Sequence, residues 1–384
     1  MERISLPERP DWRERAAELG FEFHTFDGEP YWDESACYRF TLSQIEDDLE
    51  APTEELHQMA LSLVSKIVGS EELLTRLDIP EYCWPALEAS WRRRDPHLYG
   101  RLDLAYNGHG PAKLLELNYD TPTSLYESGF FQWIWLEDQL HRGVLPAGVD
   151  QFNSLQEKLY GAFAARGNRG PLHFTCVGEN LEDRGNLDYL MDIALQAGCD
   201  ARFVDLEDIG ELQGQLVDLG NEPIHEIFKL YPWEFMVREP FGQTLLTSQT
   251  RFIEPAWKMI LSNKGMLPLL WQAFPDHPNL LPAFFDPDPA SQMAPGWVRK
   301  PLYSREGANI ELMDHQGTRL HEPGPYNDSA YVLQAFHPLP CFAGSYTLIG
   351  SWVVGDAAAG IGIREDATLI TKDSSRFLPH IILD

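Results

Sequence analysis

The clearest periodic pattern in the chain lies between Thr53 and Gly69. Apolar residues recur there at spacings of three and four, at Leu56, Ala60, Leu63, Val64 and Ile67. This spacing predicts an amphipathic helix with Thr53 as its N-cap and Gly69 at its end. Two further helices, over residues 125–141 and 152–165, are predicted as packing elements.

An alternating α/β pattern follows. We expect a strand at 173–177, a helix at 186–197, a strand at 202–206 and a further strand at 226–230 that leads into Tyr231-Pro232-Trp233-Glu234. Parallel units of this kind bind ligands at the carboxyl ends of their strands, which makes Glu179 a candidate substrate ligand.

The C-terminal third changes character. A helix is predicted from Trp257, followed by a proline-rich connector at 275–295. The pattern then indicates antiparallel strands at 297–303, 309–313, 331–336, 347–354 and 360–364, with a hairpin turn at 315–317.

Composition narrows the class of protein. The chain has 384 residues, 43% of them hydrophobic, which is enough for substantial cores. Its formal charge of −29 would repel nucleic acid and acidic membrane surfaces, so we expect no such partner. Five scattered cysteines and the absence of a signal-like or membrane-spanning segment favour free thiols in the cytoplasm.

Two lysines are candidates for binding a nucleotide phosphate chain. Lys300 ends a strand-like run and precedes a polar loop that closes at Gly307, and a buried lysine needs an anionic partner. Lys264, in Ser262-Asn263-Lys264-Gly265, would neutralise the other side of the phosphates. Each lysine alone could also be an ordinary surface residue.

Oxygen-bearing residues form a candidate Mg²⁺ site. Glu116 and Asn118 alternate along a strand and should share one face, and Asp103 supplies a second carboxylate. Arg101 lies on the same strand face as Asp103 and suits a transferring phosphoryl group because its planar guanidinium spreads charge over two oxygens. The alternative is an exposed polar hairpin.

Two weaker signals lie near the C-terminus. The run Gln334-Ala335-Phe336-His337 ends a strand, where backbone groups could contact the adenine edge. Arg364 is the last cation predicted to face the cleft, although an ion pair with a neighbouring acid is an alternative. Trp133 and Trp135 fit a core better than a cofactor site, and neither a nucleophile elbow nor a Walker-type loop is present.

Taken together, these segments resemble the glutathionylspermidine synthase family over most of the chain, from about Trp12 to the end. The segments are Arg101–Asp103, Glu116–Ser124, Lys229–Glu234, Ser262–Lys264, Lys300–Gly307 and Gly350–Arg364. The resemblance implies a mixed α+β and α/β architecture: an ATP-grasp fold preceded by an α/β substrate domain. We expect a mainly helical segment at 1–100, the metal-ligand strands and substrate domain at 101–250, and the nucleotide-binding lobes at 251–384.

The resemblance also implies residue roles. The nucleotide would contact Lys264, Lys300, Arg305, Gly307, Gln334, Ala335, Phe336 and His337. Asp103, Glu116 and Asn118 would bind Mg²⁺, and Arg101 and Arg364 would be the catalytic cations. Asp120, Thr123, Ser124, Glu179 and Glu234 would contact the substrate.

The implied activity is an ATP-dependent carbon–nitrogen ligase that forms an amide through an acyl phosphate. Its acid would be glutathione or a related peptide, and its amine a polyamine or amino compound. No room is expected for the amidase domain of the bifunctional enzymes, and Ser304 stands where glycine is common. The alternative is a regulatory or scaffolding protein that binds nucleotide without ligation. The sequence leaves the oligomeric state open.

Overall fold

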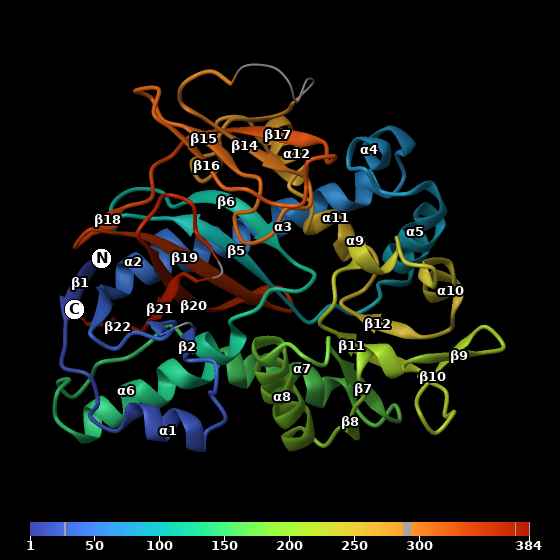
Figure 1. Ribbon diagram of the computed structural model, residues 1–384, viewed down its shortest axis with the longest axis horizontal. Helices are drawn as coiled ribbons and strands as arrows, with labels where there is room; N and C mark the ends of the chain where they lie inside the picture. The colour runs from blue at the N-terminus through green and yellow to red at the C-terminus, as the bar shows by residue number, and fades with distance from the viewer. Residues whose placement is uncertain (27, 287–292, 373, 384) are drawn as a thin grey trace.

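The computed structural model describes residues 1–26, 28–286, 293–372 and 374–383, and its strands form several sheets (Figure 1). A central antiparallel sheet has the order β21-β20-β19-β5-β6, with β18 paired to β19. Its strands are β5 (Tyr99–Ala105), β6 (Lys113–Asn118), β18 (Cys341–Phe342), β19 (Ser345–Val354), β20 (Ala357–Asp366) and β21 (Arg376–Leu378).

A second antiparallel sheet has the order β13-β17-β14-β15-β16 and lies above the central sheet in Figure 1. Its strands are β13 (Ala283–Phe285), β14 (Trp297–Pro301), β15 (Glu311–Met313), β16 (Arg319–His321) and β17 (Tyr331–Ala335). The strands expected at the C-terminal end of the chain are therefore present, but they are divided between two sheets.

The predicted α/β unit is a parallel sheet with the order β12-β11-β7-β8. It consists of β7 (Leu172–Thr175), β8 (Ala201–Phe203), β11 (Glu226–Lys229) and β12 (Arg251–Ile253). A small sheet joins the two ends of the chain. Its strands are β1 (Glu2–Ser5), β4 (Ala36–Phe40) and β22 (His380–Ile382), in that order. Two short hairpins complete the strands: β2 (Thr25–Phe26) with β3 (Glu29–Pro30), and β9 (Gly210–Leu212) with β10 (Gln215–Val217).

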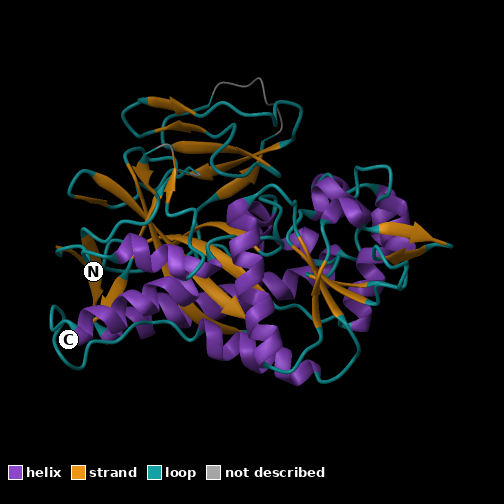
Figure 2. Cartoon of the chain, turned by 60° about the horizontal axis from the view of Figure 1, so that its bottom comes forward, coloured by secondary structure: helices purple, strands orange, loops and turns teal. Residues whose placement is uncertain are grey.

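Helices pack around the central and parallel sheets, as Figure 2 shows. They are α1 (Trp12–Glu18), α2 (Leu42–Ile45), η1 (Glu46–Glu50), α3 (Ala51–Ile67), α4 (Glu71–Arg76), η2 (Glu81–Cys83), α5 (Trp84–Arg93), η3 (Tyr126–Phe131), α6 (Gln132–His141), α7 (Leu155–Arg166), α8 (Leu181–Gln196), η4 (Leu206–Asp208), α9 (Trp233–Met236), α10 (Gly242–Thr247), α11 (Lys258–Leu261) and α12 (Met266–Ala273).

The prediction that Thr53 is an N-cap is wrong. Helical structure runs without interruption from Leu42 to Ile67, and it begins at Thr41, whose side chain and that of Gln44 form a capping box. Thr53 is instead buried inside the helix, where its hydroxyl lies 2.7 Å from the Ser351 hydroxyl. The acidic residues at 46–48 hid the true start because they interrupt the apolar pattern.

Two other helix boundaries differ from expectation. The helix after β7 begins at Leu181, because the Asn180 side chain accepts a hydrogen bond from the Asp183 backbone and caps it. The helix predicted from Trp257 is divided into α11 and α12, since the Asn263 side chain hydrogen-bonds the Gly265 amide between them. Part of the predicted proline-rich connector, 287–292, lies outside the described residues.

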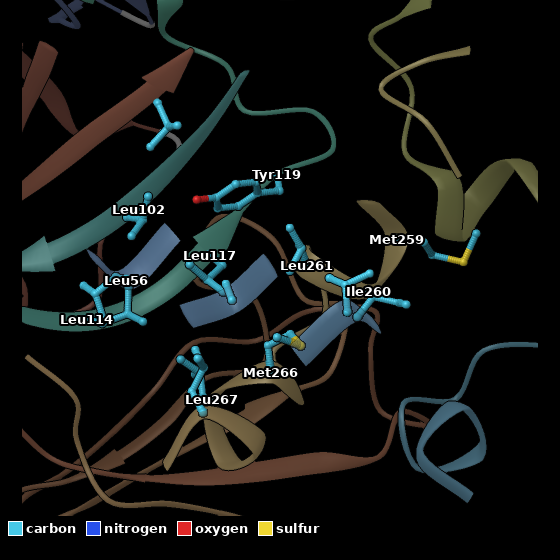
Figure 3. Close-up of a cluster of buried hydrophobic side chains, with 14 of the residues drawn as sticks. Leu56, Leu102, Leu114, Leu117, Tyr119, Met259, Ile260, Leu261, Met266 and Leu267 are labelled. Carbon is cyan, nitrogen blue, oxygen red and sulfur yellow. The ribbon is translucent and has the colours of Figure 1, made fainter. Parts of the chain in front are cut away.

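The largest core joins α3, the central sheet and the α11–α12 region (Figure 3). Leu102 of β5 and Leu114 and Leu117 of β6 face Leu56 of α3. The alternate residues of β5 point to the opposite face of the sheet, as the period of two requires. One side of the central sheet is therefore core, which leaves its other side for polar groups.

Four cysteines, Cys37, Cys83, Cys176 and Cys199, are buried as free thiols, and Cys341 is exposed. Burial raises the pKa of Cys37 to about 12 and that of Cys83 to about 11. Among the helices of the described ranges, none combines the length and the apolar character needed to cross a membrane.

A buried ion pair joins the end of β6 to the parallel sheet. The ammonium of Lys229 in β11 lies 2.5 Å from a carboxylate oxygen of Asp120, whose other oxygen accepts a hydrogen bond of 2.7 Å from the Trp233 amide. Both side chains are almost completely buried. The predicted substrate ligand Asp120 is thus occupied by a contact between two parts of the fold.

A buried histidine holds the C-terminal strand. Nε2 of His380 in β22 accepts a hydrogen bond of 3.0 Å from the Phe152 amide, and Nδ1 lies 2.9 Å from the side-chain oxygen of Gln132. Burial lowers the pKa of His380 to about 3. Because Nε2 must accept a hydrogen bond, the folded chain requires the neutral ring.

Loss of the Asp120 carboxylate should destabilise the fold. We expect Asp120→Leu to lower the free energy of unfolding by about 3–5 kcal/mol, since Lys229 would be left as a buried unpaired charge. The double variant Asp120→Leu/Lys229→Met should recover much of the loss. Urea unfolding of both variants measures this, and equal stabilities would show that the ion pair is not the cause.

Acid should destabilise the chain through His380. Its pKa is lower in the folded state than the ordinary 6.5, so the unfolded chain binds more protons and stability falls as pH drops below about 6.5. At pH 5 this effect should lower the free energy of unfolding by about 2 kcal/mol. Urea unfolding at pH 7 and 5 should show a smaller difference for His380→Gln than for the natural chain; identical differences would contradict the assignment.

Candidate active site

A cavity separates the polar face of the central sheet from the sheet that contains β14 and β17. Its polar lining consists of Tyr31, Arg101, Asp103, Glu116, Asn118, Thr121, Thr123, Ser124, Glu182, Lys300, Ser304, Arg305, Glu306, Gln334, His337, Arg364 and Thr371. Most of the residues predicted as ligands therefore meet in one place, although they come from distant parts of the sequence.

Strand register creates the polar wall. Arg101 pairs with Asn118, and Asp103 pairs with Glu116, in the antiparallel ladder of β5 and β6. Side chains of directly paired residues lie on the same face of a sheet, so these four groups line the same cavity. The register accounts for the way two separate motifs combine into one site.

Asp103 is shared by two arginines. Arg101 donates to its two carboxylate oxygens at 2.7 and 3.2 Å, and Arg364 of β20 donates to one of them at 2.8 Å. Burial and the neighbouring Arg101 lower the pKa of Arg364, so the two cations repel each other. One carboxylate cannot neutralise both, which leaves this corner attractive to an anion.

Gly350 of β19 makes room for the Arg101 side chain. A Cβ atom at Gly350 would lie 2.8 Å from Cδ of Arg101, which is closer than packed atoms allow. Gly350 pairs with Asp103 in the sheet. The glycine therefore lets Arg101 lie flat across the neighbouring strand.

Lys300 is held by oxygen acceptors from two sheets. Its ammonium donates to the Leu115 carbonyl at 2.9 Å and to the Gln334 side chain at 2.8 Å. The ladder skips Leu115, because Asp103 pairs with Glu116 and the next residue of β5 pairs with Leu114. This bulge leaves the Leu115 carbonyl for the lysine.

Lys264 forms an ion pair with Glu116 and does not belong to the cavity lining. Its ammonium is 3.3 Å from a Glu116 carboxylate oxygen and also donates to the Ser304 carbonyl. Burial opposes ionisation of Glu116, but Lys264 and Lys300 outweigh it and hold the pKa of that carboxyl well below its usual range. Burial lowers the pKa of Lys300 to about 8, despite the attraction of Glu116.

The far end of the cavity is apolar. Its lining includes Leu115, Val298, Ile310, Leu312, Leu339, Leu348, Leu369 and Ile370. Ala335 and His337 lie at its edge, whereas Phe336 is outside the lining. Gln334 is buried, and its side chain accepts a hydrogen bond from Lys300 and donates one to the Leu114 carbonyl. A flat apolar group could fill this end beside the backbone of residues 335–337.

The loop after β14 closes the other side. Gly307 has a positive φ of 75°, and a Cβ atom there would lie 2.6 Å from the Ile370 side chain. Arg305 donates to Glu234 at 2.8 Å and to the Thr121 hydroxyl at 2.9 Å. Glu234 is thus placed behind the lining, with Arg305 between it and the cavity.

The predicted substrate residues divide into two groups. Thr123 and Ser124 line the cavity, and the Thr123 carbonyl and Ser124 hydroxyl accept hydrogen bonds from Arg101. Glu179 is exposed in the loop before α8 and does not belong to the lining, and Asp120 is in the ion pair described above.

A cluster of Tyr31, Glu127 and Glu182 at the cavity was not predicted from the sequence. The Tyr31 hydroxyl donates to Glu127 at 2.7 Å and lies 3.3 Å from Glu182, and both Tyr31 and Glu182 line the cavity. Burial raises the pKa of Glu127 to about 7. Glu182 lies in the first turn of the helix after β7. The rule for α/β units pointed to the correct end of the strand, but it selected Glu179, three residues before Glu182.

Three residues of the cavity offer oxygen donors for a metal ion. No group of three or more His, Cys, Asp and Glu side chains in the described ranges is arranged to hold one. The predicted set instead combines the paired carboxylates of Asp103 and Glu116 with the Asn118 amide. These are oxygen donors of the kind that Mg²⁺ accepts together with phosphate oxygens and water, so the donor chemistry fits that ion.

The sequence is similar to those of several known proteins. A protein of Haemophilus influenzae, named as a candidate acid–amine ligase, is 40% identical over 99% of both chains. Trypanothione synthetase of Crithidia fasciculata is 28% identical over 84% of this chain, and bifunctional glutathionylspermidine synthetase/amidase of Escherichia coli is 28% identical over 90%. This chain spans only 53% and 59% of those two relatives, respectively.

Fold and family agree with these similarities. The structure of a glutathione synthetase-like effector from Globodera pallida matches over 98% of both chains with a TM-score of 0.53 at 12% identity, which confirms the predicted ATP-grasp type of fold. The family model described as "Glutathionylspermidine synthase preATP-grasp" matches residues 3–383. The chain therefore belongs to the glutathionylspermidine synthase family.

Proposed function

We propose that this chain is an ATP-dependent acid–amine ligase, which joins a carboxylate to an amine through an acyl phosphate. The observation that carries the proposal is the convergence of Lys264, Lys300, Arg101 and Arg364 around the carboxylates of Asp103 and Glu116. A site that binds a carboxylate beside a triphosphate needs this excess of fixed cations. The family and its named relatives support the same chemistry.

The nucleotide would lie along the cavity. Its adenine would fill the apolar end beside residues 335–337, and its phosphates would lie beside Lys300. Lys264 does not belong to the lining and would act from behind Glu116, with which it pairs. Because both ammonium groups are held by oxygen acceptors, they are positioned before the nucleotide arrives. Phosphate binding would favour the protonated form of Lys300, whose pKa is lowered by burial in the free chain.

Asp103, Glu116 and Asn118 are the residues that would hold Mg²⁺. The ion would supply positive charge that offsets the charge of the phosphate oxygens. Two carboxylates and one amide leave room in its coordination for the phosphates and for water. This assignment rests on the cross-strand pairing of Asp103 with Glu116 and on the side chains that share the cavity.

Arg101 and Arg364 would act on the phosphoryl group as it moves from ATP to the substrate carboxylate. Their mutual repulsion beside Asp103 would be relieved by the additional negative charge of that group. The acyl phosphate would then be captured by the amine, with release of phosphate. Their planar guanidinium groups would donate hydrogen bonds to the three equatorial oxygens of the phosphoryl group during its transfer.

Exclusion of water would fall to the loop of residues 304–308. Gly307 packs against residues 370 and 371, and all three line the cavity. An acyl phosphate hydrolyses when water reaches it, and closure would protect it until the amine attacks.

The substrate end suits a peptide acid and a cationic amine. Thr123 and Ser124 offer polar groups beside Arg101, and Glu182 with Tyr31 would favour an ammonium group. Glutathione or a related peptide is the proposed acid, and a polyamine or amino compound the proposed amine. These assignments extend the names of the relatives to this chain.

The second candidate function is a nucleotide-binding regulatory or scaffolding protein. Such a protein would need Lys300 and the apolar end, but it would have no use for Arg101 and Arg364 sharing one carboxylate. That arrangement favours ligation.

The ligase should release ADP only when acid and amine are both present. We expect a coupled ADP assay with glutathione and spermidine, or with a screen of related peptides and amines, to show this joint requirement. Lys300→Ala should abolish the signal and weaken ATP binding in calorimetry while the fold is kept. ATP binding without any substrate-dependent ADP across the screen would support the regulatory alternative.

Replacement of Arg101 by lysine should separate binding from chemistry. We expect Arg101→Lys to keep ATP affinity within a fewfold but to slow single-turnover ADP formation by about a hundredfold, because the bidentate guanidinium is lost. Arg202→Lys is the control, since Arg202 makes a similar bidentate contact with Asp200 on an exposed strand. Weaker ATP binding with an unchanged single-turnover rate would remove Arg101 from the catalytic step.

A further inference from the structure

A second cavity lies apart from the active site and shares no lining residue with it. It is bounded by the end of α5, the loop after α7, and the beginnings of β11 and β12, which lie on the opposite side of Figure 1 from β20 and β21. Its lining consists of Arg93, Arg94, Asp95, Pro96, Arg169, His225, Glu226, Gln249 and Arg251. Arginine dominates this lining, which is unexpected in a chain with twice as many acidic as basic residues.

The two carboxylates of the lining are already neutralised. Asp95 accepts hydrogen bonds of 3.1 and 2.6 Å from Arg93. Glu226 accepts a hydrogen bond of 2.6 Å from the buried Arg166, which lies behind the cavity wall, and Arg251 reaches it only at 3.9 Å. The acidic residues therefore do not offset the remaining arginines.

Arg94 and Arg169 have no carboxylate partner among the described residues, and both are exposed. Most other arginines of the chain are in ion pairs, so two unpaired guanidinium groups facing the same cavity stand out. Together with the weakly held Arg251, they bring positive charge from three separate segments to one hollow. Beyond a Debye length of about 8 Å, the overall negative charge of the chain is screened and does not cancel this local field.

The backbone at Arg94 adds an independent observation. Arg94 ends α5 in the left-handed region, with φ of 55° and ψ of 49°, where glycine is the residue that costs least. Helix termination alone would favour glycine. The left-handed cap fixes the point at which the Arg94 side chain leaves the helix, and this side chain lines the cavity.

We propose that this cavity binds a small phosphate-bearing molecule, at a site separate from the one for ATP. Guanidinium groups donate in pairs to phosphate oxygens, and Arg94, Arg169 and Arg251 bring three of these groups to the lining of one cavity. The chain's charge of −29 disfavours a long polyanion, because the segments outside the cavity would repel it. The ligand is therefore a metabolite-sized anion.

Pyrophosphate binding to the full chain tests the proposal. With ADP present in excess to occupy the first cavity, we expect calorimetry to show that Arg94→Gly/Arg169→Ala weakens pyrophosphate binding by about tenfold or more, since two charge-assisted contacts are lost. Glycine fits the backbone of residue 94 and Arg169 is exposed, so the variant should keep its fold, which circular dichroism verifies.

The matched control is Arg92→Ala/Arg202→Ala. It removes the same charge from exposed arginines that pair with Glu88 and Asp200 and do not line the cavity, and it should bind pyrophosphate as the natural chain does. Equal weakening in both double variants would overturn the site, because it would indicate a general charge effect. Absence of binding at about 10 mM pyrophosphate, or citrate binding as tight as that of pyrophosphate, would overturn it as well.

Discussion

The register of the central antiparallel sheet is the constraint on which the site depends. With Arg101 opposite Asn118 and Asp103 opposite both Glu116 and Gly350, one face of three strands carries the polar groups and the other face packs against α3. A shift by one residue would turn Asp103 and Arg101 into the core and expose Leu102 and Leu104 to the cavity. The apolar contacts of α3 therefore fix the polar wall of the cavity as firmly as they fix the core.

Sequence reasoning could identify groups whose signals are local. Glu116 and Asn118 follow the period of two along a strand, and Lys300 stands at a strand end before a polar loop. Shared use of Asp103 by Arg101 and Arg364 depends on residues 261 positions apart and on β19 lying between their strands. No local pattern could reveal that arrangement.

The same limit explains what was missed. Tyr31 and Glu127 come together from segments 96 residues apart, and the bulge at Leu115 depends on how β5 pairs with β6. Asp120 is a carboxylate and could bind a ligand, but it is paired with Lys229. A sequence pattern cannot distinguish a paired carboxylate from a free one. The prediction of Thr53 as an N-cap was wrong because the helix continues upstream through a run of polar residues.

Burial of charge runs through the whole molecule. Lys258 and Glu254 are fully buried together, and the Glu254 carboxylate also accepts hydrogen bonds from the Leu98 and Tyr99 amides at the start of β5. Buried pairs of this kind add little net stability. A misfolded arrangement that separates the two charges is strongly destabilised, because a lone charge in the interior is costly. Here the pair fixes the position of β5, the strand that carries Arg101 and Asp103.

The distribution of the thiols has a practical consequence. Burial keeps Cys37, Cys83 and Cys176 in the protonated, unreactive form, whereas Cys341 lies at the surface on β18, hydrogen-bonded to the edge of β19. A maleimide dye added to the folded chain would therefore select one position without engineering. Because Leu348 of β19 lines the cavity and β18 pairs with β19, a dye at that natural attachment point would report on ligand binding.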